Sequence, residues 1–307
     1  MSQKRVVIGT RGSALALWQA DHVADRLRAA HPGLVVERTI VVTTGDRTSE
    51  GPLWQAGGKG VWVKEIEEAL LQGAIDLAVH SLKDVPAELA EGLVLAAIPD
   101  RADNRDALVS RDGARLADLP AGARVGTTSL RRVCQVHALR PDLCLEPLRG
   151  NLDTRLRKVA DGVVDAAILA CAGLDRLGFA DRITERLSIE QMLPAIGQGA
   201  LAIEIRETDQ RSKLLCRSLA SAEAEITVTA ERALLRHLGA GCRTPVAGCA
   251  LVRQGQLHVH GLVGRPDGTV ILRESVTGPT KRAEALGIDL AEALLAHGAD
   301  RILAESG

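Results

Sequence analysis

Short apolar runs alternate with amphipathic helical stretches from residue 5 to about residue 205, and this alternation constrains the fold most strongly. Strand-like runs occupy 5–10, 34–42, 75–79, 124–127, 143–147, 166–170 and 201–205, and helical spacing appears in 61–71, 129–139 and 151–160. Ser13 is placed to cap another helix, which ends at His31-Pro32-Gly33. Repeated strand–helix units predict open α/β sheets.

The chain has 307 residues, more than one hydrophobic core usually serves. The polar stretch 100–106 and residues 194–199 are natural links between sheets. We therefore predict a first α/β lobe from 1–99 with 200–217, to which strand 201–205 returns, and a second lobe from 100–199. A helix over 222–238, strands over 244–252, 256–263 and 270–276, and a helix over 282–295 predict a small α+β domain from 218–307.

Composition excludes some classes of partner. Lys plus Arg number 38 against 39 Asp plus Glu, and the net charge of −1 gives no reason to bind nucleic acid or membrane. One Phe, three Trp and no Tyr offer little for base stacking. The first residues lack the apolar core of a signal peptide and no run reaches membrane-spanning length, so we expect a cytoplasmic protein. Six cysteines without a CxxC pair predict free thiols and no metal site.

Cys242 lies in the small-residue turn Gly239-Ala240-Gly241-Cys242-Arg243-Thr244-Pro245, between a predicted helix and the strands of the tail. Glycines remove steric cover from a thiol, which favours chemistry over packing. A nucleophile, a redox switch and no chemical role at all remain open for this thiol. A cysteine nucleophile of an acyl transferase needs a base, and His237 is the only candidate near in sequence.

Arginines occur where predicted strands pass into helices, within 10–13, 127–132 and 149–155. Open α/β sheets place their ligands at these carboxyl ends of strands. A helix start already carries partial positive charge, so an arginine there favours an external anion. Guanidinium groups, with the hydroxyls of Ser13 and Ser129, provide donors for carboxylates or phosphates. We therefore predict a polyanion site.

Asp84 also follows a predicted strand, in the motif His80-Ser81-Leu82-Lys83-Asp84-Val85-Pro86. Pro86 biases the chain before it toward an extended conformation that can direct the carboxylate into the site. Asp84 is either a local cap or a group that transfers protons or stabilises a transient cation. The loop Gly57-Gly58-Lys59-Gly60 lacks the spacing of a nucleotide-binding loop, and we interpret it as a lid.

Seven motifs occur in the order found in a known family. They are Thr10–Ala16, Gly57–Gly60, His80–Pro86, Gly126–Arg132, Leu148–Asn151, Pro194–Ala200 and the stretch from Glu231-Arg232 to Pro245. On these motifs, which run in order along essentially the whole chain, the protein resembles the porphobilinogen deaminases, also called hydroxymethylbilane synthases.

The resemblance implies a cytoplasmic, monomeric transferase of tetrapyrrole (haem and porphyrin) biosynthesis. Such enzymes join four porphobilinogen molecules head to tail, lose one ammonia each time, and release 1-hydroxymethylbilane. Their cofactor is dipyrromethane, two linked pyrroles held by a thioether to a cysteine, here Cys242. The implied fold is α/β, with two hinged, doubly wound lobes of the type II periplasmic-binding-protein kind and a small α+β C-terminal domain.

The resemblance also implies residue roles. Asp84 would be catalytic, stabilising the cationic methylene-pyrrolenine left when ammonia departs. Lys59 and Trp62 would belong to the active-site loop that shields this electrophile from water. Every pyrrole carries an acetate and a propionate, which would explain the arginines. The implied cofactor-binding residues are Cys242, Arg11, Ser13, Ser81, Lys83, Asp84, Thr127, Thr128, Ser129, Arg131, Arg132, Arg149, Gly150, Arg155, Arg176 and Gln198.

Three positions depart from the family pattern. Gln55 stands where many relatives have lysine, Trp62 where phenylalanine is common, and Leu145 where a polar residue often contacts the cofactor. These departures bear on positioning and rate more than on reaction type. The competing class is a non-catalytic two-lobe anion-binding protein, which leaves Cys242 and Asp84 without a role.

Overall fold

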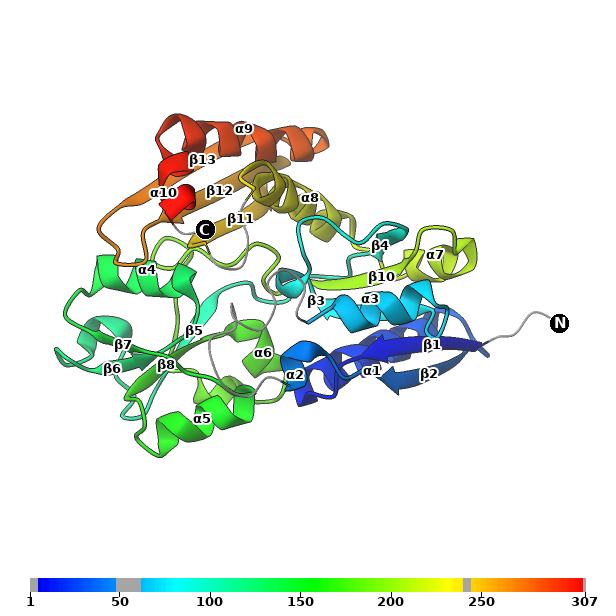
Figure 1. The fold of residues 1–307 in the computed structure, drawn as a ribbon, viewed down its shortest axis with the longest axis horizontal. Coiled ribbons are helices and arrows are strands. Elements are labelled where there is room, and N and C mark those ends of the chain that lie inside the picture. Colours follow the sequence, from blue (N-terminus) through cyan, green and yellow to red (C-terminus); the bar gives the residue numbers. More distant parts are fainter. Residues whose placement is uncertain (1–4, 48–61, 240–243, 306–307) are drawn as a thin grey trace. The chain divides into compact units, whose positions relative to one another are not determined.

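The computed structural model describes residues 5–47, 62–239 and 244–305. The chain divides into two compact units, Met1–Ala102 with Ala200–Glu225 and Asp103–Gly199 with Ile226–Gly307. Figure 1 shows the elements of both units. The three-domain boundaries drawn from the sequence stay a prediction.

The first unit is built on a five-stranded sheet in the order β2-β1-β3-β10-β4. Strand β1 (Arg5–Thr10) is parallel to β2 (Val35–Ile40) and to β3 (Leu77–Ser81). Strand β10 (Leu201–Arg206) is antiparallel to its neighbours β3 and β4 (Leu93–Ala97). The chain therefore returns to this sheet after forming the second one, as the sequence predicts.

Helices cover both faces of the first sheet. Helix α1 (Ala14–Ala30) buries Val23 and Leu27 in one apolar cluster, to which α7 (Gln210–Arg217) contributes Cys216. Helix α3 (Lys64–Leu71) buries Ile66 and Leu70 in a cluster with the other face. The short helices α2 (Thr44–Arg47) and η2 (Leu82–Asp84) complete the described part of this unit. This is the doubly wound arrangement predicted for the lobe.

The second unit has a sheet of related order, β7-β6-β8-β5-β9. Strand β6 (Arg124–Gly126) is parallel to β7 (Cys144–Glu146) and β8 (Ala166–Ala170), and β5 (Asp106–Ser110) is antiparallel to β8 and to β9 (Glu185–Arg186). Helices α4 (Leu130–Leu139), α5 (Leu152–Ala160) and α6 (Cys171–Arg176) follow β6, β7 and β8. In each sheet order, three parallel strands are thus followed by one antiparallel strand, which is β10 in the first sheet and β5 in the second. A fifth strand, β4 or β9, completes the sheet.

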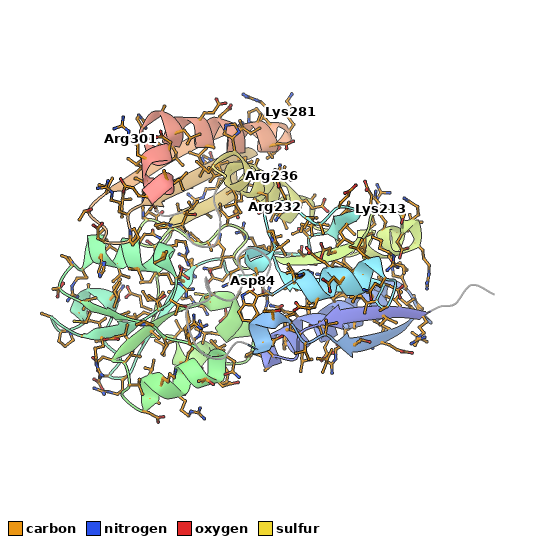
Figure 2. The ribbon with its side chains drawn as sticks, in the orientation of Figure 1. Asp84, Lys213, Arg232, Arg236, Lys281 and Arg301 are labelled. Atoms are coloured by element: carbon orange, nitrogen blue, oxygen red, sulfur yellow. The ribbon has the colours of Figure 1, made fainter. Side chains whose placement is uncertain are left out.

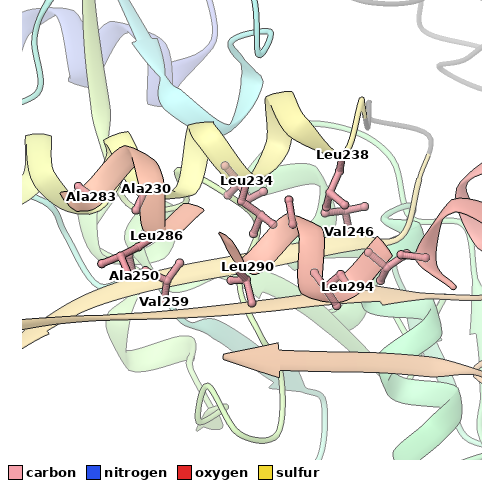
Figure 3. Close-up of a cluster of buried hydrophobic side chains, with 14 of the residues drawn as sticks. Ala230, Leu234, Leu238, Val246, Ala250, Val259, Ala283, Leu286, Leu290 and Leu294 are labelled. Carbon is pink, nitrogen blue, oxygen red and sulfur yellow. The ribbon is translucent and has the colours of Figure 1, made fainter. Parts of the chain in front are cut away.

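The C-terminal part is an antiparallel sheet of β11 (Val246–Arg253), β12 (Gln256–Gly264) and β13 (Ile271–Pro279). Helices α8 (Ala222–His237), α9 (Ala283–Ala296) and α10 (Ala299–Glu305) contribute to its core. Figure 3 shows Leu234 of α8 and Leu290 and Leu294 of α9 in this apolar cluster. A Cβ at Gly287 would lie 2.2 Å from the carbonyl oxygen of Ala230, so glycine permits the close approach of the two helices.

The predicted α/β class is confirmed, because the protein contains two doubly wound α/β sheets and a small α+β part. The strands that were not predicted are β4, β5 and β9, and β5 begins at Asp106, which the sequence assigns to a link. Helices α2, α6, α7 and α10 were not predicted either.

Candidate active site

A pocket in the first unit lies where β1 and β3 end. Parallel neighbours end at the same edge of a sheet, so the segments that follow them meet there. Five predicted site residues line this pocket, namely Arg11, Ser13, Trp62, Ser81 and Asp84. Gln19 and His80 also line it, and neither had been assigned a role. Gln19 is a buried polar residue on an otherwise apolar helix face, and this break in the pattern was the available signal.

Asp84 is the last residue of η2, immediately beyond β3 (Figure 2). The backbone N–H of Val85 closes this turn on the carbonyl of Leu82 at 3.0 Å, and Leu82 is buried. The turn therefore fixes the position of Asp84, whose side chain is half-buried. Within the residues that the structure describes, the Asp84 carboxylate has no hydrogen-bond or ion-pair partner.

Two serines of the pocket have defined local contacts. Ser13 is the N-cap of α1, and its Oγ accepts a hydrogen bond from the backbone N–H of Ala16 at 3.3 Å. Ser81 ends β3, and its Oγ accepts one from Gln19 Nε2 at 2.8 Å. In both serines the hydroxyl hydrogen remains available to a ligand.

Arg11 has two partners within the first unit. Its Nε donates to Asp46 Oδ1 at 3.1 Å, and its guanidinium carbon lies 4.0 Å from the centroid of the Trp62 ring. Burial alone would raise the pKa of Asp46, but hydrogen bonds from Arg11 and Thr43 lower it. Arg11 is therefore oriented by an internal carboxylate and an aromatic face before any ligand arrives.

In the second unit, Thr127, Thr128 and Ser129 lie between β6 and α4. Thr127 is buried and its Oγ1 accepts a hydrogen bond from the backbone N–H of Ser129 at 3.2 Å, whereas Thr128 is exposed. Ser129 is the N-cap of α4, and its side chain forms no capping hydrogen bond. The start of α4 thus keeps donors that a carboxylate can use.

Arg131, Arg132 and Gln198 surround a single buried carboxylate, that of Asp106. Arg131 Nη1 and Arg132 Nη2 each lie 2.7 Å from it, and Gln198 Nε2 lies 3.0 Å away. The arginines also donate to the carbonyls of Leu193 and Ile168. Sequence spacing predicted an external anion for these arginines, and the structure supplies an internal one. Their contact with a ligand stays a prediction.

Arg149, Gly150 and Arg155 lie together around the start of α5. Arg155 Nε donates to the carbonyl of Gly150 at 2.8 Å, and Asn151 caps the helix by accepting from the N–H of Thr154 at 2.9 Å. Arg149 is half-buried, and within the described residues its guanidinium forms no hydrogen bond or ion pair. Arg149 therefore remains open to an anion.

Arg176 and Lys83 are both half-buried cations. Arg176 Nη2 donates to the carbonyl of Gly199 at 2.8 Å, and desolvation by burial lowers the pKa of Arg176 to about 10. Removal from water weakens the hydration of a cation, so an added carboxylate would stabilise it.

Leu145 of β7 packs against an apolar cluster of the second sheet. Cys242, Lys59 and Gln55 lie outside the described residues.

The chain matches two family models in succession. Residues 6–214 match the model described as "Porphobilinogen deaminase, dipyromethane cofactor binding domain", and residues 225–296 match "Porphobilinogen deaminase, C-terminal domain". The protein belongs to the porphobilinogen deaminase family. A porphobilinogen deaminase of Syntrophotalea carbinolica is 52% identical over 304 residues, covering 99% of this chain and 96% of the relative. One from Geobacter metallireducens is 50% identical over 305 residues, with the same coverage.

Among solved structures, a methionine-binding protein, MetQ, aligns with a TM-score of 0.46 at 15% identity, over 73% of this chain and 93% of that one. In the ranges that the structure describes, no helix combines the length and apolar character needed to cross a membrane. Those same ranges contain no group of three His, Cys, Asp or Glu side chains arranged to hold a metal ion.

Porphobilinogen deaminases are hydroxymethylbilane synthases, transferases of tetrapyrrole biosynthesis that use a dipyrromethane cofactor. The described residues fit a polycarboxylate of this kind. Arg149 has an open guanidinium, and Ser129 heads α4 without a capping bond, as expected for donors that await an acidic ligand. Asp84 places one unpartnered carboxylate in a pocket whose lining includes the donors Arg11, Ser13 and Gln19.

Proposed function

We propose that the protein condenses four porphobilinogen molecules into 1-hydroxymethylbilane on a dipyrromethane joined by a thioether to Cys242. The dipyrromethane, when bound, supplies the free pyrrole α-carbon from which the chain grows. Asp84 is the catalytic residue of this proposal, and the protein acts as a cytoplasmic monomer. Matches to both porphobilinogen deaminase domains support the substrate, and the site residues are the proposal's own.

One observation carries the role of Asp84, its unpartnered carboxylate at the pocket. Loss of ammonia from porphobilinogen leaves a cationic methylene-pyrrolenine, and a carboxylate near the pyrrole N–H stabilises that cation. A carboxylate already neutralised by an internal arginine would do so less well. Asp84 has no such partner among the described residues, whereas Asp46, Asp103 and Asp106 all pair with arginines.

The acetate and propionate groups need several donors. In the first unit Arg11, Ser13, Ser81 and Lys83 serve those next to Asp84. In the second unit the donors are Thr127, Thr128, Ser129, Arg131, Arg132, Arg149, Gly150, Arg155, Arg176 and Gln198. Lys59 and Trp62 belong to the cover of the pocket, and Trp62 offers a π-face against which a pyrrole can stack.

Intact mass tests the attachment to Cys242. Protein purified from active cells should be heavier than its sequence by two pyrrole units, and Cys242→Ser should lose this increment. Cys249→Ser, which removes a buried thiol of the same C-terminal part, should keep it. An unmodified mass for active wild-type protein would contradict the attachment.

Turnover tests Asp84. Asp84→Asn preserves shape and removes the charge, so kcat should fall at least about 100-fold while the added mass stays. Glu88→Gln, at an exposed carboxylate four residues away, should leave kcat unchanged. Near-normal turnover by Asp84→Asn would contradict the assigned role.

A further inference from the structure

His80 and Glu204 form a buried pair beside the Asp84 pocket. In the register of β3 and β10, His80 is opposite Ala202, and Glu204 lies two residues further along β10. This diagonal relation places both side chains on one face of the sheet, with His80 Nε2 3.0 Å from Glu204 Oε2. Their side chains are 5% and 1% exposed.

Glu204 uses only one of its two carboxylate oxygens. Oε1 is buried and has no hydrogen-bond partner within the described part of the chain. Glu67 of α3 lies close enough to sense the pair, because its pKa is raised first by burial and then by the charge of Glu204, while His80 lowers it. Two ionisable groups at this depth stabilise a fold less than apolar side chains of the same volume. Their presence points to a use other than packing.

The hydrogen bond decides which nitrogen of His80 faces a ligand. A carboxylate only accepts, so Nε2 carries the hydrogen, and in the neutral ring the lone pair lies on Nδ1. His80 lines the pocket together with Ser81 and Asp84. Among the described residues Nδ1 has no hydrogen-bond partner, and it is not fully shielded from solvent. Nδ1 is therefore the ring atom available to a molecule in the pocket.

We propose, on the basis of the function proposed above, that His80 is a catalytic proton acceptor of the condensation and that Glu204 is its positioning residue. In each condensation a C–C bond forms between a pyrrole α-carbon and the methylene carbon of porphobilinogen. The C–N bond of the protonated aminomethyl group breaks, and ammonia leaves with its electron pair. The α-carbon then loses its proton, which His80 Nδ1 accepts and passes to ammonia. Ammonium departs and the neutral imidazole is restored.

Asp84, His80 and Glu204 then have separate roles. Asp84 keeps its negative charge throughout and stabilises the transient cation, so it need not also remove the proton. Glu204 fixes the tautomer of His80 and stabilises the imidazolium while it exists, as a buried carboxylate does for a catalytic histidine elsewhere.

His80→Gln separates catalysis from packing. The glutamine amide reaches the position of Nε2 and keeps the contact with Glu204, but it removes the group at Nδ1. We expect kcat to fall about 100-fold, the size of a general-base contribution, with KM, melting temperature and the cofactor mass near wild type. His31→Gln, a histidine of the same unit at the end of α1, is the matched control and should leave kcat unchanged. A folded His80→Gln protein with kcat within about threefold of wild type would overturn the proposal.

Added bases give a second test that does not depend on the glutamine variant. In His80→Ala, which opens space at the pocket, imidazole should restore kcat at least about tenfold, whereas pyrazole, of the same shape and much weaker basicity, should not. Equal rescue by both rings would mean that the space is merely filled, and would overturn the catalytic role.

Nitrogen-15 spectra of the resting protein test the geometry without turnover. The neutral His80 ring should carry its hydrogen on Nε2, and Glu204→Gln should change the tautomer balance while lowering kcat about tenfold. An Nδ1–H tautomer in the wild type would refute the assignment. Asp84→Asn distinguishes the two proposals: its normal turnover would reject the proposed function, whereas an inactive Asp84→Asn beside a fully active His80→Gln would reject the role of His80 alone.

Discussion

Arg132 donates two hydrogen bonds to the carboxylate of Asp106, from Nε at 3.1 Å and from Nη2 at 2.7 Å. The two side chains are 8% and 0% exposed, and Arg131 pairs with the same carboxylate. Burial alone would raise the pKa of Asp106, but the charges of Arg131 and Arg132 hold it well below its usual range. One buried carboxylate therefore balances two buried guanidinium groups inside the second unit.

We expect Asp106→Asn to destabilise the protein strongly. Two buried cations would lose their counter-charge, and removal of one partner from a buried ionic network costs about 3–5 kcal/mol. The midpoint of urea unfolding of the cofactor-loaded protein measures this. Asp112→Asn removes an exposed carboxylate that pairs with Arg111, and its midpoint should stay near wild type. Equal midpoints for Asp106→Asn and wild type would show that the network contributes nothing.

The pairing of Asp106 with its arginines also predicts how the unfolding free energy depends on pH. The pKa of Asp106 is lowered on folding, so its stabilisation is complete above the unfolded value of about 3.9 and is lost as the pH falls toward the folded value. The difference in unfolding free energy between wild type and Asp106→Asn should therefore shrink below about pH 4. A difference that stays constant from pH 7 to pH 3 would contradict this account.

Local patterns predicted the elements that place the site. Ser13 and Asn151 were identified at helix starts and both are N-caps, because capping depends on residues only three positions apart. Helices α6 and α7 have six and eight residues, too few for apolar periodicity to stand out. Strand β5 was not predicted because Asp106, its first residue, was assigned to a polar link, and a buried aspartate is unexpected until its arginines are known.

Motif spacing did not predict contacts between side chains that are far apart in the sequence. Arg11 was expected to await an external anion, yet it pairs with Asp46, 35 residues later. His80 was read as part of a motif, but its carboxylate partner Glu204 is 124 residues away on the returning strand. Such pairs depend on strand order, which the alternation of strands and helices does not specify.

Gly150 should tolerate substitution less well than Gly122. Its φ is +113°, and a Cβ there would lie 2.6 Å from Thr154 Cγ2. Gly150→Ala should cost about 2–3 kcal/mol of stability and raise the KM for porphobilinogen, because the Gly150 carbonyl holds Arg155. Gly122 also has positive φ, at +77°, but no atom within 4 Å of its added Cβ, so Gly122→Ala should cost only about 1 kcal/mol and leave KM unchanged. Equal losses in both variants would show that the Thr154 contact is unimportant.

The position of the Trp62 ring should depend on the absence of a side chain at Gly45. A Cβ at Gly45 would lie 2.2 Å from Trp62 Cε3 and 2.3 Å from Cζ3, atoms of the larger indole ring. Gly45→Ala should therefore displace the ring from Arg11 and raise KM about threefold to tenfold. Trp62→Phe removes the second ring and should tolerate Gly45→Ala with less than about a twofold further change. The same loss in both backgrounds would contradict the contact.

Thiol labelling should separate the six cysteines by burial. Burial raises the pKa of Cys134 to about 11 and that of Cys171 and Cys216 to about 12, so these thiols are protonated at neutral pH. Cys249 is also buried, with Asn104 Nδ2 3.1 Å from its sulfur, whereas Cys144 is exposed. Iodoacetamide at pH 8 should therefore modify native protein at Cys144 at least about 100-fold faster than at the four buried thiols.

Thiol labelling of the urea-unfolded protein tests the cofactor attachment. In urea the buried thiols lose their protection, and cofactor-loaded protein should label at every cysteine except Cys242, whose sulfur is already alkylated under the proposed function. Cys242→Ser supplies the control, because it should label at the same five positions while lacking the added pyrrole mass. Labelling of Cys242 in urea-unfolded protein that carries the extra mass would place the cofactor on another residue. Rapid labelling of native Cys171 or Cys216 would instead contradict the burial on which their raised pKa values rest.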